Sequence, residues 1–331
     1  MRCAVIGAGA WGTAIADLLA RGEHDVRLWA YERDVADGIG ARRQNARFLP
    51  GVTLAAELAA TSDIGVAVEE AEMVVWAAPS HVLRVVSRSA AGSVARTATQ
   101  VVATKGIERD TLALMTDIVA DELHGRPVVA LSGPSFAAEV AARQPTAVVA
   151  ASAHGDAAAL VQHAFSSDTF RVYTHTDVVG VELGGALKNV VALATGIAEG
   201  LGLGYNPRAA LITRGLAEIT RLGVALGASP LTFAGLAGMG DLVLTCTGAL
   251  SRNRTVGVEI GRGSTLEEVL ASRETVAEGV VTTQSAHALA AREGIDMPIV
   301  AAVHRTLFER QPARRAITDL MTRELRAEHE R

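Results

Sequence analysis

Lys188 lies in a part of the sequence that predicts a buried helix. The stretch GVELGGALKNVVAL, residues 180–193, is apolar nearly all round, which is typical of a helix inside a protein. The neighbours of Lys188 at helical spacing are small or apolar: Gly184, Gly185, Val191 and Ala192. We expect them to leave a groove where the ammonium group meets a ligand. Removal from water lowers the pKa of a lysine toward neutrality, which suits proton transfer. The alternative is a structural lysine that snorkels or pairs with Glu182.

A second cation and a carboxylate are candidates to act with this lysine. Lys105 comes just after the strand-like run 99–103, where it is either part of the site or a solvated loop residue. Asp241 stands between glycines and an apolar run, and it could orient Lys188, bind a hydroxyl group or cap a helix. The candidate catalytic residues are therefore Lys188, Lys105 and Asp241.

Two segments have the composition of anion-binding sites. At Ser251, Arg252 and Asn253 a helix begins, so a helix dipole, a guanidinium fork and an amide could together bind a phosphate group. The alternative is a capped surface helix. Residues 132–136, Ser-Gly-Pro-Ser-Phe, indicate a loop opening a helix whose N–H groups could hold an anion, or else an ordinary helix begun by proline.

The glycine-rich run Gly7-Ala8-Gly9-Ala10-Trp11-Gly12 predicts a dinucleotide site. It lies between an apolar strand, residues 3–6, and a helical pattern, residues 13–21, with a second strand at 26–29. In that context the glycines let the backbone approach a pyrophosphate at the helix N-terminus. A merely tight turn is the alternative.

The end of the second strand bears on the choice of cofactor. Ala30 occupies the expected ribose-recognition position and Arg33 follows it, which favours or at least admits the 2′-phosphate of NADP. The alternative is that Glu32 binds the ribose and Arg33 is a solvated residue, which would favour NAD.

The first half of the chain alternates strand-like and helical patterns. Such alternation predicts a mostly parallel sheet with helices on both faces and ligands at the carboxyl ends of the strands. After the two strands above, further strands are expected at residues 73–78, 99–103, 127–131, 146–150 and 170–173.

From about Asp177 helical patterns dominate, so we expect a sheet domain over residues 1–177 and an all-helical domain over 178–331. Asn206-Pro207 is a good helix start and Gly227 a good stop, and residues 323–331 are expected to form a frayed helix. The helices are expected at 178–203, 207–226, 252–262, 265–272, 279–293 and 298–310.

Composition is that of a globular enzyme. The 331 residues are 49% hydrophobic and 20% charged with a net charge of −5, and the absence of a basic stripe argues against nucleic-acid binding. Apolar stretches are interrupted before the length of a membrane span, and no signal-type layout opens the chain. Cys3 and Cys246 lack metal-site spacing and are not expected to form a disulfide. We expect a cytoplasmic protein without a metal.

The motifs taken together resemble the bacterial NAD(P)-dependent glycerol-3-phosphate dehydrogenases. The resemblance runs in order from Met1 to about Phe308. It is carried by GAGAWG, APSHVLR, ATKGIE, SGPSFAAEVA, GVELGGALKNVVAL, NPRAALITRGLAEITRLG, GLAGMGDLVLTC and SRNR. It implies a Rossmann-type domain and a helical domain akin to the C-terminal domain of 6-phosphogluconate dehydrogenase. It also implies reversible reduction of dihydroxyacetone phosphate to sn-glycerol 3-phosphate for phospholipid synthesis, a homodimer, and NADPH or NADH as cofactor.

The resemblance also implies residue roles. Lys188 matches the proton-transferring lysine of the family. Residues matching contacts to substrate are Lys105, Gly133, Ser135, Asp241, Ser251, Arg252 and Asn253. Residues matching contacts to the cofactor, with the glycines of the turn, are Gly7, Gly9, Ala10, Trp11, Gly12, Arg33, Lys105, Ala137, Arg252, Val276 and Glu278. Ala10 stands where relatives commonly have serine, which spares the backbone amide. A related dehydrogenase for a hydroxy acid or acyl-CoA and a non-catalytic NADPH sensor are the competing interpretations.

Overall fold

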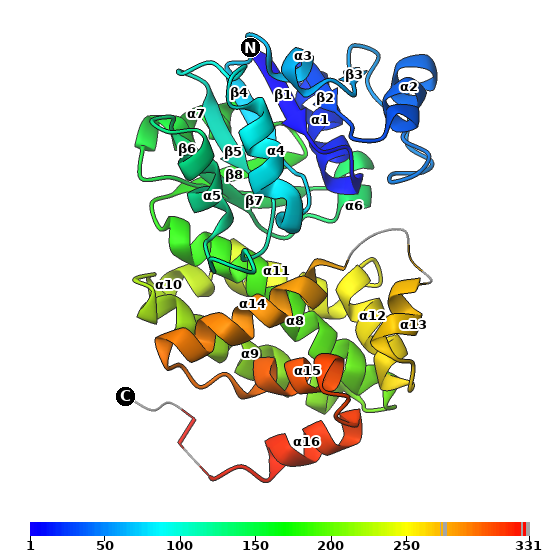
Figure 1. The fold of residues 1–331 in the computed structure, drawn as a ribbon, viewed down its shortest axis with the longest axis vertical. Coiled ribbons are helices and arrows are strands. Elements are labelled where there is room, and N and C mark those ends of the chain that lie inside the picture. The colour runs from blue at the N-terminus through cyan, green and yellow to red at the C-terminus, as the bar shows by residue number, and fades with distance from the viewer. Residues whose placement is uncertain (272, 274–276, 326, 329–331) are drawn as a thin grey trace.

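The structure is a computed structural model that describes residues 1–271, 273, 277–325 and 327–328. A sheet flanked by helices forms one end of the molecule and a group of helices the other (Figure 1). The chain crosses between the two parts at Asp177, which accepts a hydrogen bond from Gly180 N and begins the long helix α8 (Val178–Gly200).

The sheet has eight strands in the order β3-β2-β1-β4-β5-β6-β7-β8, parallel except for the β6–β7 pair. The strand order reverses between β1 and β4, and the crevice at such a reversal is where open parallel sheets bind ligands. The strands are β1 (Arg2–Ile6), β2 (Asp25–Trp29), β3 (Ala59–Thr61), β4 (Met73–Trp76), β5 (Thr99–Val102), β6 (Val128–Ser132), β7 (Thr146–Ala151) and β8 (Phe170–His175).

Central strands such as β4, Met-Val-Val-Trp, are buried on both faces, which requires helices on each side of the sheet. One apolar core joins the sheet to α1 and α7, and a second joins its opposite face to α3, α4 and α5. The helices of this part are α1 (Ala10–Arg21), α2 (Arg33–Arg42), α3 (Ile64–Val68), the 3₁₀ turn η1 (Ser80–Val82), α4 (Leu83–Ala90), α5 (Met115–Glu122), α6 (Ala137–Ala141) and α7 (Gly155–Phe165).

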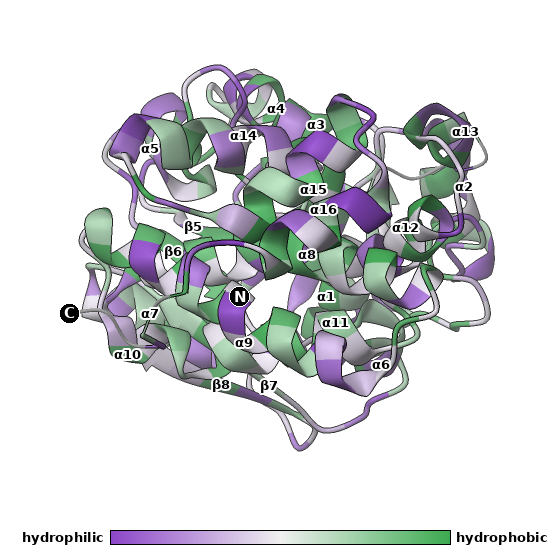
Figure 2. Ribbon diagram, turned by 90° about the horizontal axis from the view of Figure 1, so that it is seen from below, coloured by the Kyte–Doolittle hydropathy of each residue, from purple (hydrophilic) through white to green (hydrophobic). Residues whose placement is uncertain are grey.

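The second part is helical and is built around α8. Figure 2, seen from the helical end, shows α8 near the middle of the view with other helices around it. Every residue from Gly180 to Ala198 is buried. The remaining elements are α9 (Tyr205–Ala225), α10 (Pro230–Phe233), the π-helical turn η2 (Leu236–Gly240), α11 (Asp241–Thr247), α12 (Arg252–Gly261), α13 (Leu266–Ala271), α14 (Glu278–Glu293), α15 (Pro298–Phe308) and α16 (Ala313–Met321).

Helices α8 and α12 cross at backbone contact because glycines face each other. A Cβ atom on Gly196 would lie 2.1 Å from Arg254 O, and one on Gly257 would lie 2.3 Å from Leu193 O. Gly200 and Gly261 repeat the arrangement one turn further on. The crossing fixes the start of α12 relative to α8, and these are the two helices that carry Arg252, Asn253 and Lys188.

The structure confirms the mostly parallel sheet and the helical second half. Each of the seven predicted strands is present, and the buried helix around Lys188 is confirmed. The three-residue strand β3 was not predicted. The predicted start of a helix at Asn206-Pro207 is wrong, because α9 begins at Tyr205 with Gly204 as its N-cap. Proline fits there because the first-turn amides of a helix need no acceptor within it.

The helices differ from the prediction at further points. A helix over 323–331 is wrong for its described residues, which follow α16 without helical structure, and α16 itself was not predicted. Helix α11 in the glycine-broken stretch was also missed. Two segments, Val178–Gly200 and Pro230–Thr247, are long and apolar enough to cross a membrane by length and composition. In Val178–Gly200, 83% of the most apolar window is buried in the protein, and the expectation that the chain does not span a membrane stays a prediction.

Candidate active site

Three charged side chains from three separate elements meet at one point. Asp241, the first residue of α11, is 1% exposed, and each of its carboxylate oxygens accepts a hydrogen bond from a different lysine. Lys188 Nζ donates to Oδ1 at 2.5 Å, and Lys105 Nζ donates to Oδ2 at 2.6 Å. Lys188 Nζ also donates to Thr245 Oγ1, one turn along α11, at 2.9 Å. The structure thus brings together the three residues predicted to be catalytic.

The chain contains 31 lysine and arginine residues, of which Lys105 and Lys188 are the only lysines. Both lie on Asp241. An arginine stays protonated at any pH a protein experiences, whereas a buried lysine can lose its proton near neutrality. Of these two lysines, Lys188 is the buried one, and burial lowers its pKa toward neutrality.

The electrostatics of the cluster poise Lys188 for proton transfer. Burial lowers the pKa of the Lys188 ammonium to about 8, against the opposing effect of Asp241, and the charge of Lys105 lowers it further. Burial pushes the pKa of the Asp241 carboxyl upward, but the two ammonium groups outweigh it, so that pKa lies below its usual value. Asp241 therefore stays ionised while Lys188 titrates in the range where general acids and bases operate.

Two expectations about the surroundings of Lys188 need correction. Glu182 does not pair with the lysine, because its carboxylate accepts hydrogen bonds from Thr116 N and Thr116 Oγ1 at the start of α5. The small residues beside Lys188 do not leave an open groove. A Cβ on Gly184 would lie 2.5 Å from Ala237 O, and one on Gly185 would lie 2.5 Å from Ser132 Oγ, so neighbouring chain fills that space.

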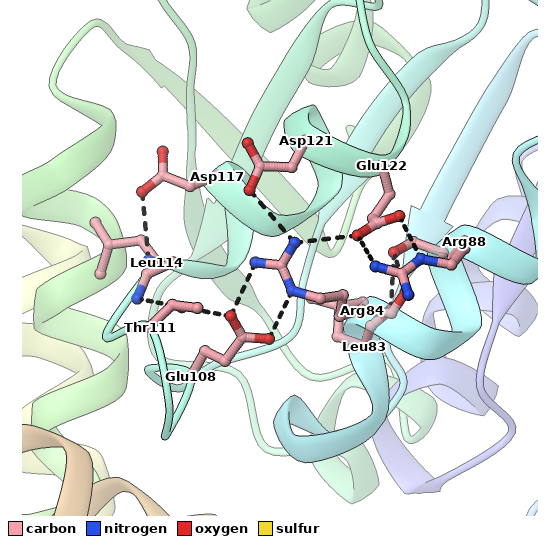
Figure 3. Close-up of polar contacts among 11 residues, drawn as sticks. Leu83, Arg84, Arg88, Glu108, Thr111, Leu114, Asp117, Asp121 and Glu122 are labelled. Carbon is pink, nitrogen blue, oxygen red and sulfur yellow. Dashed lines mark hydrogen bonds and ion pairs between the residues drawn. The ribbon is translucent and has the colours of Figure 1, made fainter.

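Lys105 stands on a loop that is fixed at several points. Its ammonium reaches Gly133 O at 3.4 Å, the residue predicted to line the substrate. Three residues further along, both oxygens of Glu108 accept hydrogen bonds from Arg84 of α4 at 2.8 Å. Figure 3 shows the Arg84 guanidinium between Glu108 and the acidic residues Asp121 and Glu122 of α5. This network ties the loop to two helices of the sheet domain.

The start of α12 has the cap that the sequence predicts. Ser251 Oγ accepts a hydrogen bond from Arg254 N at 3.3 Å, and Arg252 is exposed on the first turn. Asn253 Oδ1 accepts from Gly279 N at 2.9 Å, and Asn253 Nδ2 donates to Oδ1 of Asn189, the residue after Lys188, at 2.9 Å. The candidate phosphate residues and the candidate catalytic lysine are therefore joined through one buried amide pair.

The turn after β1 fits a dinucleotide. A Cβ on Gly7 would lie 2.7 Å from Ala78 N, and one on Gly12 would lie 1.9 Å from Gly7 O, whereas Gly9 faces open space. The turn therefore packs tightly on its inner side and leaves room for a phosphate group beside the first amides of α1. Trp11 Nε1 is buried without a hydrogen-bond partner among the described residues. Ala10, also in the turn, packs with Trp11 against the sheet core.

Three other residues predicted to contact the cofactor each begin a helix. Arg33 is exposed at the start of α2, the helix that follows β2, and Ala30 is buried. Ala137 begins α6, and Ser135 Oγ of the preceding loop donates to Gly133 O at 3.0 Å. Glu278 begins α14 and reaches the sheet domain at Ser80. Val276 lies outside the described residues.

Sequence reasoning did not single out Thr245 or Asn189, and it gave Ser80 no contact with Glu278. Thr245 follows Asp241 by four positions, which would have placed it on the same helix face had α11 been predicted. Asn189 and Ser80 form hydrogen bonds with residues that are distant in the sequence, and no local sequence pattern predicts such contacts.

A parallel sheet with a glycine turn at its crevice, facing a helical domain that supplies a buried lysine–aspartate cluster, defines an NAD(P)-dependent dehydrogenase of the two-domain type. The comparisons with known proteins narrow the class. The profile of the NAD-dependent glycerol-3-phosphate dehydrogenase N-terminus matches residues 2–158, and that of the C-terminus of the same family matches residues 177–318. The chain belongs to the NAD-dependent glycerol-3-phosphate dehydrogenase family.

Relatives cover the whole chain. Glycerol-3-phosphate dehydrogenase [NAD(P)+] of Geobacter sp. (strain M21) is 54% identical over 330 residues, 99% of this chain and 98% of the relative. The protein of the same name from Geobacter metallireducens is 56% identical, covering 98% of both chains. The crystal structure of glycerol-3-phosphate dehydrogenase from Coxiella burnetii is similar with a TM-score of 0.94 and 40% identity, over 97% of this chain and 99% of that one.

Proposed function

We propose that this protein catalyses the reversible reduction of dihydroxyacetone phosphate to sn-glycerol 3-phosphate with NADPH or NADH. The observation that carries the proposal is the pairing of both lysines of the chain with one buried carboxylate at the face between the two domains. The family of the chain supports the substrate and the use of NAD(P).

Lys188 is the proton donor in the reducing direction. The reduced nicotinamide, when bound, supplies a hydride to the carbonyl carbon. Lys188 Nζ gives its proton to the carbonyl oxygen as negative charge develops there, which yields the secondary alcohol and a neutral amine. Lys105 adds a second positive charge near that oxygen, and Asp241 holds both ammonium groups in position.

The start of α12 binds the phosphate group. Arg252 offers a planar fork, Asn253 has an amide hydrogen beyond the one bound by Asn189, and the helix N-terminus favours an anion. With the phosphate held there, Gly133, Ser135 and Lys105 line the other end of the substrate. The arrangement orients the carbonyl toward Lys188 and disfavours ketones without a phosphate group.

The residues that would hold the cofactor are those of the glycine turn with Trp11 and Ala137, and Glu278 on the helical side. Arg33, exposed at the start of α2, favours NADPH over NADH because its guanidinium can pair with a 2′-phosphate. We infer that the enzyme works in the cytoplasm as a homodimer and supplies glycerol 3-phosphate for phospholipid synthesis, on the basis of its resemblance to the family.

The test is the decay of NADPH absorbance with purified protein and dihydroxyacetone phosphate, with NADH in parallel. Rapid oxidation that is faster with NADPH supports both the reaction and the role of Arg33. Equal or faster oxidation of NADH would contradict the role of Arg33 in cofactor choice but not the reaction. No oxidation of either cofactor by protein that binds NADPH would contradict the reaction and favour a related dehydrogenase or a sensor.

A further inference from the structure

Ser80 connects the two domains through a single carboxylate. Its backbone N–H donates to Glu278 Oε1 at 3.2 Å and its hydroxyl donates to Glu278 Oε2 at 2.5 Å. Ser80 is 3% exposed. A Cβ on Gly106, the residue after Lys105, would lie 2.7 Å from the Cβ of Ser80. Ser80 is therefore held between the Lys105 loop and the first turn of α14.

The position of this contact in the fold indicates what it faces. Ser80 follows β4, and β1 and β4 are the neighbouring strands between which the strand order reverses. The ADP half of a dinucleotide lies on the β1–β2 side of such a crevice, over the glycine turn. The nicotinamide half therefore crosses to the β4 side, where Ser80 and Glu278 meet.

We propose that Ser80 is a positioning residue for the cofactor, which holds the Glu278 carboxylate so that it accepts hydrogen bonds from the hydroxyl groups of the nicotinamide-side ribose. The inference rests on the proposed function, because it takes the ligand to be NADPH or NADH. A carboxylate has about four acceptor positions, and Ser80 uses two of them, so two remain for a vicinal diol.

The charges around Glu278 fit this role. Arg252 of α12 and His81 of η1 lie close enough to lower the pKa of its carboxyl, as do the hydrogen bonds from Ser80, although burial has the larger effect and raises it. The carboxylate thus faces the neutral hydroxyl group of Ser80 and two basic side chains, one from η1 and one from α12.

The experiment compares two ligands. Isothermal titration calorimetry measures the Kd of the full-length protein for NADPH and for adenosine 2′,5′-bisphosphate, a fragment without the nicotinamide riboside. We expect Ser80→Ala to raise the Kd for NADPH about tenfold, the loss expected when a hydrogen bond to a charged group is removed. The Kd for the fragment should stay unchanged. Ser89→Ala, an exposed hydroxyl on α4, is the control and should alter neither value.

A double-mutant cycle shows whether Ser80 acts through Glu278. Glu278→Ala should weaken NADPH binding at least as much as Ser80→Ala, and adding Ser80→Ala to it should have no further effect. Equal weakening of NADPH and the fragment would overturn the inference, because it would indicate a purely structural clasp between the domains. Additive effects of the two substitutions would overturn it as well. Wild-type protein that binds NADPH but does not reduce dihydroxyacetone phosphate would contradict the proposed reaction and leave the Ser80 inference to be decided by the binding data.

Discussion

Lys188 and Asp241 form an ion pair of 2.5 Å in which the carboxylate, through its second oxygen, also binds the other lysine of the chain. The one buried negative charge therefore neutralises the positive charges of buried Lys188 and half-buried Lys105 only in part. The remaining positive charge lowers the pKa of Lys188. It also favours binding of an anionic substrate at the site.

The first prediction concerns pH. Because burial lowers the pKa of Lys188 to about 8, the protonated form needed for reduction is lost as pH rises through that value. We expect kcat/KM for ketone reduction to fall as the pH rises through 8 and that for glycerol 3-phosphate oxidation to rise through pH 8 and level off above it. Protein labelled with 15N-lysine contains side-chain signals from two lysines, so the titration of Lys188 can be followed directly by NMR. A Lys188 signal that titrates near pH 10.5 would contradict the prediction.

The second prediction concerns the phosphate site. Arg252→Ala should raise the KM for dihydroxyacetone phosphate about 10- to 100-fold, because a charge-assisted hydrogen bond to the phosphate is lost. Arg262→Ala, an exposed arginine at the other end of α12, should leave that KM unchanged. Steady-state kinetics at saturating NADPH gives both values. An unchanged KM for the Arg252 variant would remove this residue from the phosphate site.

The third prediction concerns the crossing of α8 and α12. Gly257→Ala adds a methyl group where a Cβ would lie 2.3 Å from Leu193 O, so the helices must move apart. We expect the free energy of unfolding to fall by about 1–3 kcal/mol and the KM for dihydroxyacetone phosphate to rise. Gly40→Ala, at an exposed helical site with open space, should stabilise the protein by about 0.5–1 kcal/mol without affecting KM. Wild-type stability and KM in the Gly257 variant would show that the crossing does not position the site.

The fourth prediction concerns the anchor of the Lys105 loop. Arg84→Met removes both hydrogen bonds to Glu108, three residues after Lys105, and should lower kcat by about tenfold, because the loop is no longer held in one place. Arg88→Met breaks an ion pair with Glu122 from a side chain that is 66% exposed (Figure 3), and it should change kcat little. Similar loss of kcat in the two variants would contradict the anchoring role.

The sequence predicted the sheet well because its strands are buried runs of apolar residues, such as Met73 to Trp76, with glycine or helical segments between them. It missed β3 because three residues, Ala-Ala-Thr, carry no pattern of their own and pair only because β2 lies beside them. It missed α11 because glycines at 238 and 240 indicate a break, whereas in the structure Gly238 packs against the backbone of Phe233 in α10, where a Cβ would lie 2.2 Å from Phe233 O.

The site divides in the same way. Lys188, Asp241 and Ser251 were predictable as candidates because each stands out against its local surroundings. Their partners were not predictable. The hydrogen bond between Lys188 and Asp241 spans 53 positions in the chain, and the one between Ser80 and Glu278 spans 198. Only the folded arrangement of the helices shows that Glu182 pairs with Thr116 and leaves Lys188 to Asp241.

The measurement that tests the central claim most directly compares wild-type protein with the Lys188→Ala variant. Both are assayed for oxidation of NADPH by dihydroxyacetone phosphate, and NADPH binding is measured by calorimetry on the same preparations. If Lys188 donates the proton, kcat of the variant falls by a factor of about 100 to 10,000, while its Kd for NADPH stays near that of the wild type. Comparable turnover in the two proteins would contradict the assignment of Lys188.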